Sequence, residues 1–203
     1  SLRQLLSHSS GLGYRFLEAD ADGPYARAGV SDGMDASPVS LAENVRRIAQ
    51  APLLFAPGSQ WLYSLGVDVA GAVAEAATGE TLQALFARLL AAPLGLRDTA
   101  FATADAARLA TPYVSDMPQP HRLREGEMVA PFEGTVGIEY SLARATDASR
   151  FASAGAGLVG TADELMAVLE ALRDVRASGL LPPALAAEMA SPQVGEQGPP
   201  EPA

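Results

Sequence analysis

Tyr63 stands where a turn meets an apolar helix, a setting in which a phenol can take part in chemistry. Pro57-Gly58 signals the turn, and Trp61 and Tyr63 alternate, so both side chains point the same way if the segment is extended. A phenol ionises at about pH 10 in water, so it becomes a useful base only where a nearby cation stabilises the phenolate. Most tyrosines placed in this way are simply packed, with the hydroxyl bound by a neighbour. The spacing alone leaves both interpretations open.

The composition excludes several kinds of chemistry. All 14 basic residues are arginine, so no lysine amine can serve as a base or form a Schiff base. The chain has no cysteine, which removes disulfides, thiolate nucleophiles and thiolate metal ligands. Its two histidines, His8 and His121, are far apart in sequence, and we expect neither a metal site nor a cofactor. The net charge of −10 argues against a nucleic-acid partner, and no apolar run reaches the roughly 18 residues that a membrane span needs.

A second set of residues could form a hydrolase triad. Residues 29–33 read GVSDG, which matches the G-x-S-x-G pattern with Ser31 as nucleophile, and Asp98 and His121 follow in the order serine, acid, histidine. That pattern works only where an apolar strand precedes it and a helix follows directly. Residues 20–28 are polar and no helical pattern follows, so a chance match is favoured over an α/β-hydrolase that uses Ser31.

Hydrophobic periodicity and capping signals predict a chain built mainly from helices. We expect a short first helix with His8 in its last turn as a structural residue, a long surface loop over residues 13–39, and a loose hairpin near residues 111–131. Further helices are expected at residues 40–50, 66–78, 81–93, 103–110, 161–175 and 183–190.

Two of these helices make specific predictions about burial. The helix over residues 66–78 is apolar nearly all round, so we expect it to be buried. The helix after the glycine-rich run should turn Leu165 and Leu169 inward, together with Leu172 and Val175. Glycines before a helix can cradle phosphate, but this run lacks the required spacing, and close backbone packing is the favoured interpretation.

Four segments, in order, resemble the serine β-lactamase-like hydrolases. Residues 5–12 (LLSHSSGL) resemble that family's LLTHTSGL signature, and residues 57–64 (PGSQWLYS) resemble its PG-x-x-W-x-YS segment. Residues 78–99 resemble its TG…PLGM-x-DT pattern, and residues 155–165 resemble GGAGL-x-S-x-x-DL. The family includes class C β-lactamases, D-alanyl-D-alanine peptidases and family VIII carboxylesterases, and the likeness is nearest to the esterases.

The resemblance spans about residues 1–176 and implies a serine acyl-enzyme mechanism. In the family, a Ser-x-x-Lys motif supplies the nucleophile and its partner amine, and the tyrosine that matches Tyr63 shuttles the proton. Many members carry Tyr-x-Asn, whose asparagine binds an amide-bearing substrate, whereas Leu65 stands there in this chain and can neither donate nor accept. The resemblance therefore implies hydrolysis of a small ester, with a β-lactamase or D-alanyl-D-alanine peptidase as the alternative.

Because the chain has no lysine, it cannot contain the Ser-x-x-Lys motif. The family places that motif before LLTHTSGL, and places a late strand of the oxyanion hole beyond the segments matched here. We therefore expect the middle portion of a longer hydrolase, mainly α with minor β: the helical subdomain of the β-lactamase-like fold with most of the central antiparallel sheet missing. Alone it should be inactive, and its partner should be the remainder of its own chain or a complementing chain.

The same interpretation predicts one partial domain over residues 1–191 and a mobile tail over residues 192–203. It predicts exposed apolar surface unless another chain covers it. We expect a cytoplasmic location, with any export signal lying upstream. A non-catalytic helical binding module descended from such a hydrolase is the alternative to an enzyme.

Overall fold

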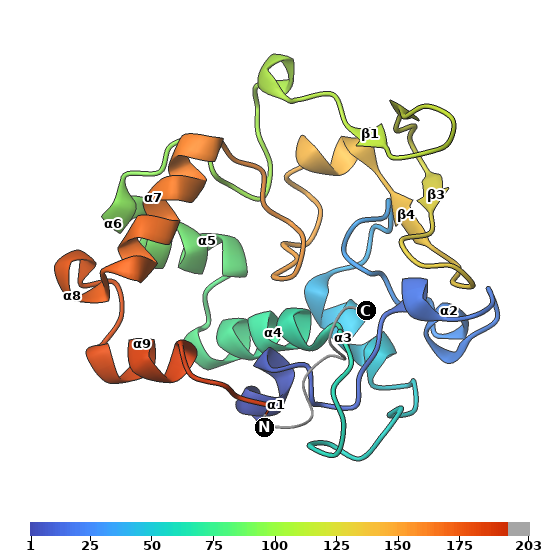
Figure 1. The fold of residues 1–203 in the computed structure, drawn as a ribbon, viewed down its shortest axis with the longest axis horizontal. Helices are drawn as coiled ribbons and strands as arrows, with labels where there is room; N and C mark the ends of the chain where they lie inside the picture. Colours follow the sequence, from blue (N-terminus) through green and yellow to red (C-terminus); the bar gives the residue numbers. More distant parts are fainter. Residues whose placement is uncertain (195–203) are drawn as a thin grey trace.

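The computed structural model describes residues 1–194, and helices dominate it (Figure 1). Its α-helices are α1 (Leu2–Leu6), α2 (Pro24–Arg27), α3 (Leu41–Ile48), α4 (Gly66–Thr78), α5 (Leu82–Phe86), α6 (Ala92–Leu94), α7 (Ala162–Arg173), α8 (Val175–Ser178) and α9 (Pro183–Met189). A π-helical segment, η2 (Ala87–Ala91), joins α5 to α6, and 3₁₀ turns form η1 (Arg15–Leu17), η3 (Ala106–Arg108) and η4 (Leu142–Ala145). Helices α7 to α9 lie along one side of the molecule, the strands lie towards the other, and α4 packs against α1 between them (Figure 1).

The strands of the described residues form two small antiparallel sheets. In one, β1 (Tyr113–Val114) pairs with β2 (His121–Arg122). In the other, β3 (Glu127–Val129) pairs with β4 (Ile138–Tyr140). The mainly helical prediction with minor β is therefore confirmed. The single hairpin predicted near residues 111–131 is wrong in extent, because β3 takes its partner from further along the chain.

Capping hydrogen bonds account for the helix starts that the sequence predicts. The hydroxyls of Ser40, Thr81 and Thr161 each accept a hydrogen bond from the backbone N–H three residues on, as expected for N-caps. Gly79 ends α4 in the left-handed conformation, at φ 73°, which glycine adopts without strain. The helix predicted over residues 103–110 is wrong, since that segment contains only the turn η3.

The surface loop predicted over residues 13–39 is wrong, because this segment supplies much of the hydrophobic core. Tyr14, Phe16, Tyr25 and Val30 are each 4% exposed or less and belong to one cluster with Leu65. The sequence of this segment looks like a loop because buried polar side chains, not a helix or sheet, provide hydrogen-bond partners for its backbone N–H groups. This segment therefore packs against Leu65, at the end of the stretch that carries Tyr63.

Helix α4 is buried only over its first half, so the prediction of a fully buried helix is partly wrong. Asp68 and Gly71 are buried, whereas Val73 is 40% exposed. Helix α7 likewise leaves Leu165 and Leu169 outside, at 59% and 49% exposed, which contradicts their predicted inward direction. The prediction of exposed apolar surface is confirmed. Other exposed large apolar side chains include Leu2, Leu6, Leu89, Met166, Leu185 and Met189.

Most of the predicted mobile tail, residues 195–203, lies outside the described residues. Before it, α9 ends close to where the sequence predicts, and the Gln193 amide donates to the Glu188 carbonyl at 2.7 Å. Within residues 1–194, no helix is long and apolar enough to cross a membrane.

Candidate active site

Tyr63 lies on a short extended segment that is pinned to the N-terminal part of the chain. The Leu62 N–H donates to the His8 carbonyl at 2.9 Å, and the Leu65 N–H donates to the Gly13 carbonyl at 3.1 Å. Because these two bonds flank Tyr63, its backbone is fixed on both sides. Its side chain is 43% exposed, so the ring is open to solvent rather than sealed in the core.

His8 supports one face of the Tyr63 ring. The two ring centroids lie 4.9 Å apart, and the His8 ring meets that of Trp61 at 6.0 Å. Nδ1 accepts a hydrogen bond from the Ser64 N–H at 3.1 Å, so a neutral ring carries its proton on Nε2. Burial lowers the pKa of His8, which favours that neutral form.

The structural role predicted for His8 agrees with these contacts, but its predicted place in the helix is wrong. Helix α1 ends at Leu6, and His8 follows it with φ 56°, in the left-handed region that few non-glycine residues adopt. The turn aims the imidazole at Ser64 instead of at the end of the helix.

Tyr14 lies against Tyr63 from the core. Their ring centroids are 4.9 Å apart with an interplanar angle of 37°, and Tyr14 also stacks on Phe16 at 4.6 Å. Burial raises the pKa of Tyr14 strongly, and the neighbouring Tyr63 phenol and the carboxyls of Asp68 and Asp32 raise it further. Tyr14 is therefore a buried, neutral phenol beside an exposed one.

Asp68 is 1% exposed in the first turn of α4. Its Oδ1 accepts from the Ala154 N–H at 2.8 Å. Burial raises the pKa of Asp68, opposed by the Ser153 hydroxyl and by the N–H groups of Ala154 and Gly155. The carboxyl thus ties α4 to residues 153–157.

Gly155 brings this second loop into contact with the tyrosine pair. A Cβ at Gly155 would lie 3.3 Å from both the Tyr14 hydroxyl and the Asp68 Oδ2. The close backbone packing predicted for the glycine-rich run is therefore confirmed. The sequence interpretation missed Tyr14 and Asp68; the available signals were an aromatic residue two positions before Phe16 and an acid in the first turn of an apolar helix.

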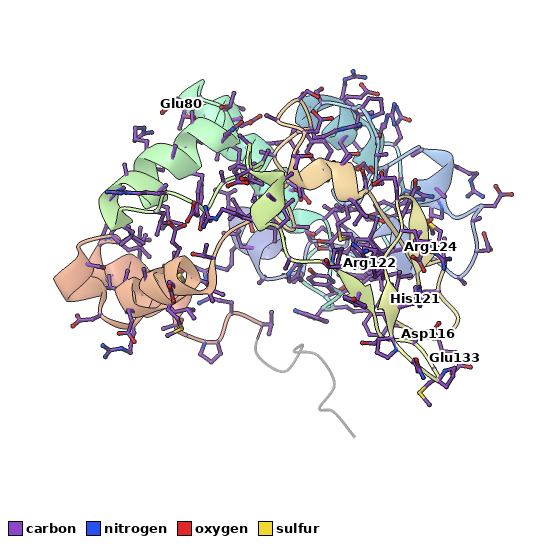
Figure 2. The ribbon with its side chains drawn as sticks, turned by 90° about the horizontal axis from the view of Figure 1, so that it is seen from above. Glu80, Asp116, His121, Arg122, Arg124 and Glu133 are labelled. Carbon is purple, nitrogen blue, oxygen red and sulfur yellow. The ribbon has the colours of Figure 1, made fainter. Side chains whose placement is uncertain are left out.

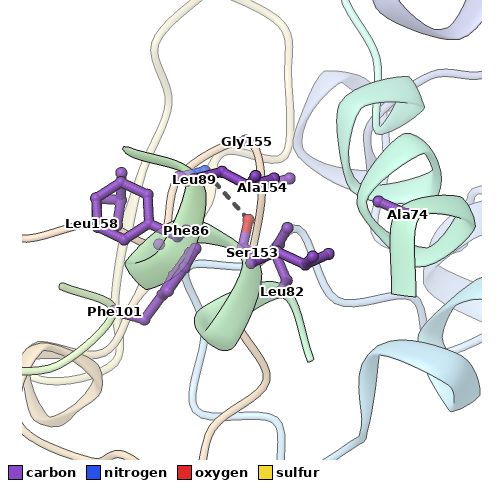
Figure 3. Close-up of a pocket in the computed structure, with 12 residues that line it drawn as sticks. Ala74, Leu82, Phe86, Leu89, Phe101, Ser153, Ala154, Gly155 and Leu158 are labelled. Carbon is purple, nitrogen blue, oxygen red and sulfur yellow. Dashed lines mark hydrogen bonds between the residues drawn. The ribbon is translucent and has the colours of Figure 1, made fainter. Parts of the chain in front are cut away.

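Two apolar cavities flank these residues. One, of about 550 Å³, lies beyond residues 153–158, where Leu82, Phe86 and Phe101 line it and the Ala156 N–H donates to the Ser153 hydroxyl at 3.1 Å (Figure 3). The other, of about 730 Å³, is lined by His8 and Trp61 together with apolar side chains of α1 and α9. Tyr63 lines neither of these two cavities; one borders the loop that contains Gly155, and the other borders His8 and Trp61.

The alternative triad of Ser31, Asp98 and His121 is not assembled. Ser31 is 1% exposed, and its hydroxyl donates to Asp35 at 2.8 Å. The Asp98 carboxylate accepts from the Arg108 guanidinium at 2.7 Å, not from a histidine.

The third member, His121, is partly buried and bonds Glu127 at 2.6 Å. It lies beside Asp116 on the opposite side of the molecule from Glu80 (Figure 2). A buried serine with no histidine partner cannot act as a nucleophile, so the prediction of a chance match stands against the α/β-hydrolase alternative. No group of three or more potential metal-ligating side chains occurs within the part of the chain that the structure describes.

Comparison with known proteins agrees with this arrangement. The chain is 44% identical to Esterase EstB of Burkholderia gladioli over 96% of its own length and 49% of that protein. The structure of EstCE1, described as a hydrolase with promiscuous acyltransferase activity, superimposes with a TM-score of 0.89 at 45% identity, over 95% of this chain and 50% of that one. A variant of simvastatin synthase from Aspergillus terreus gives a TM-score of 0.64 at 27% identity, over 97% and 43% of the two chains.

The chain thus spans about half the length of these relatives. Residues 1–202 match the Beta-lactamase family. The resemblance of the four segments is confirmed, and this chain belongs to the Beta-lactamase family, with the β-lactamase-like fold.

Proposed function

We propose that this chain is the tyrosine-bearing portion of a serine carboxylesterase that cleaves small esters through an acyl-serine intermediate. The observation that carries the proposal is the geometry of Tyr63, an exposed phenol held between His8 and Tyr14. The 44% identity to an esterase over 96% of the chain supports it. Leu65, which has no polar side chain, favours esters over the amide substrates of β-lactamases and D-alanyl-D-alanine peptidases.

In the proposed mechanism, Tyr63 acts as the general base. Its phenolate takes the proton of the serine hydroxyl as the serine oxygen attacks the ester carbonyl. The phenol then returns that proton to the departing alcohol, which leaves an acyl-serine. In the second half, water attacks the acyl-serine and gives its proton to Tyr63, and Tyr63 returns that proton to the serine oxygen as the acid is released.

The serine and the lysine that supports the phenolate belong, in this proposal, to peptide outside these 203 residues, because the chain contains no lysine. The same missing peptide carries most of the central antiparallel sheet. Support comes from the half-length match to the relatives and from the exposed apolar side chains on α1, α7 and α9. The partner is thus the remainder of the same protein or a complementing chain.

Acyl transfer is a second candidate activity, because EstCE1 is described as a hydrolase with promiscuous acyltransferase activity. The chemistry differs only in the last step, where an alcohol replaces water as the acceptor of the acyl group. The apolar cavity beside His8 and Trp61 offers space for an organic acceptor.

The full-length protein tests the proposal with short-chain p-nitrophenyl esters. Tyr63→Phe should lower kcat by about 100-fold or more, because it removes the proton-accepting oxygen and keeps the ring. Tyr113→Phe is the matched control, since Tyr113 is 62% exposed on β1, and it should leave turnover unchanged. Full activity in Tyr63→Phe, or turnover by the isolated 203 residues, would refute the assignment.

A further inference from the structure

Arg144 is a buried cation that the proposed mechanism does not use. It lies in the turn η4 and is 9% exposed. Its Nη1 donates to the Asp35 carbonyl at 3.2 Å, and its Nη2 donates to the Phe151 carbonyl at 2.8 Å. The guanidinium carbon lies 4.6 Å from the centroid of the Phe151 ring. Contacts from two segments far apart in the chain therefore fix the guanidinium in one position.

The charge of this guanidinium has no direct partner among the residues that the structure describes. An arginine side chain has five N–H donors, and the two hydrogen bonds above use two of them, so three are left without a protein acceptor. Buried cations are normally paired, because burying an unpaired charge costs free energy. Burial accordingly lowers the pKa of Arg144.

The acidic groups around Arg144 act on it only at a distance. They are Asp35, Asp68 and Asp147, which oppose the effect of burial on its pKa. Each carboxylate is bound elsewhere: Asp35 accepts from a buried serine hydroxyl, Asp68 accepts from a backbone N–H, and Asp147 pairs with Arg150 at 2.8 Å. An anion in contact with the guanidinium would therefore make a pairing that the described residues leave open.

A cavity of about 210 Å³ opens beside Arg144. Its other walls are mainly apolar, and the residues that form them include Met34, Ala145, Leu158 and Val159. The volume is below the usual range for a drug-sized ligand, so the cavity suits a molecule of a few heavy atoms. A guanidinium at one wall and apolar side chains at the others match an anion with a short apolar tail.

We propose that this cavity binds a short-chain carboxylate, whose oxygens accept from the free N–H donors of Arg144 and whose alkyl chain lies against Leu158 and Val159. A planar carboxylate matches the fork of a guanidinium, whereas sulfate or phosphate would place further oxygens against the apolar walls. Tyr63 does not line this cavity, so the inference does not rest on the proposed function.

Butyrate is the probe, added to the full-length protein near neutral pH at constant ionic strength. The melting temperature should rise with butyrate concentration and then level off, as expected for a ligand that binds only the folded state. Butyramide, which has nearly the same shape and no charge, should have no such effect. Isothermal titration calorimetry then gives the Kd for butyrate.

Two substitutions and one control test the position of the site. Arg144→Gln should weaken butyrate binding by about tenfold or more, because it removes the charged donors. Ala145→Leu should weaken it as much, because it fills the cavity and keeps the hydrogen bonds of Arg144. Arg150→Gln is the matched control: Arg150 does not line the cavity and pairs with Asp147, so the Kd should stay within about twofold.

Ala145→Leu keeps the test decisive if Arg144→Gln does not fold. An unchanged Kd in Ala145→Leu would place butyrate elsewhere, the ester-cleaving site included, and would overturn the inference. An equal response to butyramide, or no saturable response to butyrate, would also overturn it. Tyr63→Phe should bind butyrate as the wild type does, so an esterase assignment that fails leaves this site untouched.

Discussion

At the scale of single residues, Asp32 fixes the backbone that presents Tyr14. Its carboxylate accepts from the N–H groups of Arg15 and Phe16 at 2.9 and 3.1 Å, and its side chain is almost fully buried. Burial raises the pKa of Asp32 to about 7, against the opposing effect of those two donors. The folded protein therefore binds this proton more tightly than the unfolded chain does.

Stability should consequently fall as pH rises between about 4 and about 7, because over that window the folded state holds a proton that the unfolded state has lost. Asp32→Asn removes this titration. The stability of the wild type relative to Asp32→Asn should decrease by up to about 1.4 kcal/mol per pH unit across the window. Urea unfolding at several pH values measures it, and a constant difference between the two proteins would contradict the prediction.

At the scale of elements, α3 holds the segment before it through one buried amide. Asn44 is 0% exposed; its Oδ1 accepts from the Ser31 N–H at 2.8 Å, and its Nδ2 donates to the Ser31 carbonyl at 2.9 Å. The side chain thus replaces the two bonds that a neighbouring strand would make. This pairing fixes the serine that the sequence offered as a nucleophile.

Asn44→Ala should destabilise the protein by about 2 kcal/mol or more, because it leaves both backbone groups of Ser31 buried without partners. Arg46→Ala on the same helix is the control. Its side chain is 72% exposed and pairs only with Glu43 at the surface, so the change should be small. Equal unfolding free energies for the two variants would show that Asn44 does not hold the segment.

Helix starts could be predicted from the sequence because each depends on a local signal, as at Ser40 and Thr161. The buried course of residues 13–39 could not, because its bonds join positions far apart, such as Arg15 with Asp32. Periodicity identifies the apolar face of a helix but not what covers it, so it predicts Leu165 inward although this side chain is 59% exposed. The same limit applies to the site. Tyr63 can be identified from its motif, whereas the position of Tyr14 beside it depends on tertiary contacts between residues far apart in sequence.

At the scale of the whole molecule, helices α7 and α9 expose large apolar side chains that nothing within residues 1–194 covers. Leu165, Met166 and Leu169 share the outer face of α7, and Leu185 and Met189 lie outside on α9. Surfaces of this kind are usually covered by a partner. The half-length match to the relatives agrees with the remainder of the fold as that partner.

The isolated 203 residues should therefore bind a hydrophobic dye such as anilinonaphthalene sulfonate and self-associate, and co-expression with the remaining peptide of the full-length protein should abolish both. Size-exclusion chromatography with dye fluorescence measures this. Replacing Leu165 and Leu169 with glutamate should weaken recovery of esterase activity by the co-expressed pieces. A dye-silent monomer from the isolated chain would contradict the prediction.

Gly155 has no side chain, so its loop can pack close to Tyr14 and Asp68. Adding a methyl group there would force the Tyr14 hydroxyl and the Asp68 carboxyl, each at 3.3 Å, to yield by a few tenths of an ångström. The distance between helix α4 and this loop therefore depends on residue 155 having no Cβ. Gly155→Ala would therefore shift the Tyr14 phenol slightly without altering the chemical groups of Tyr63.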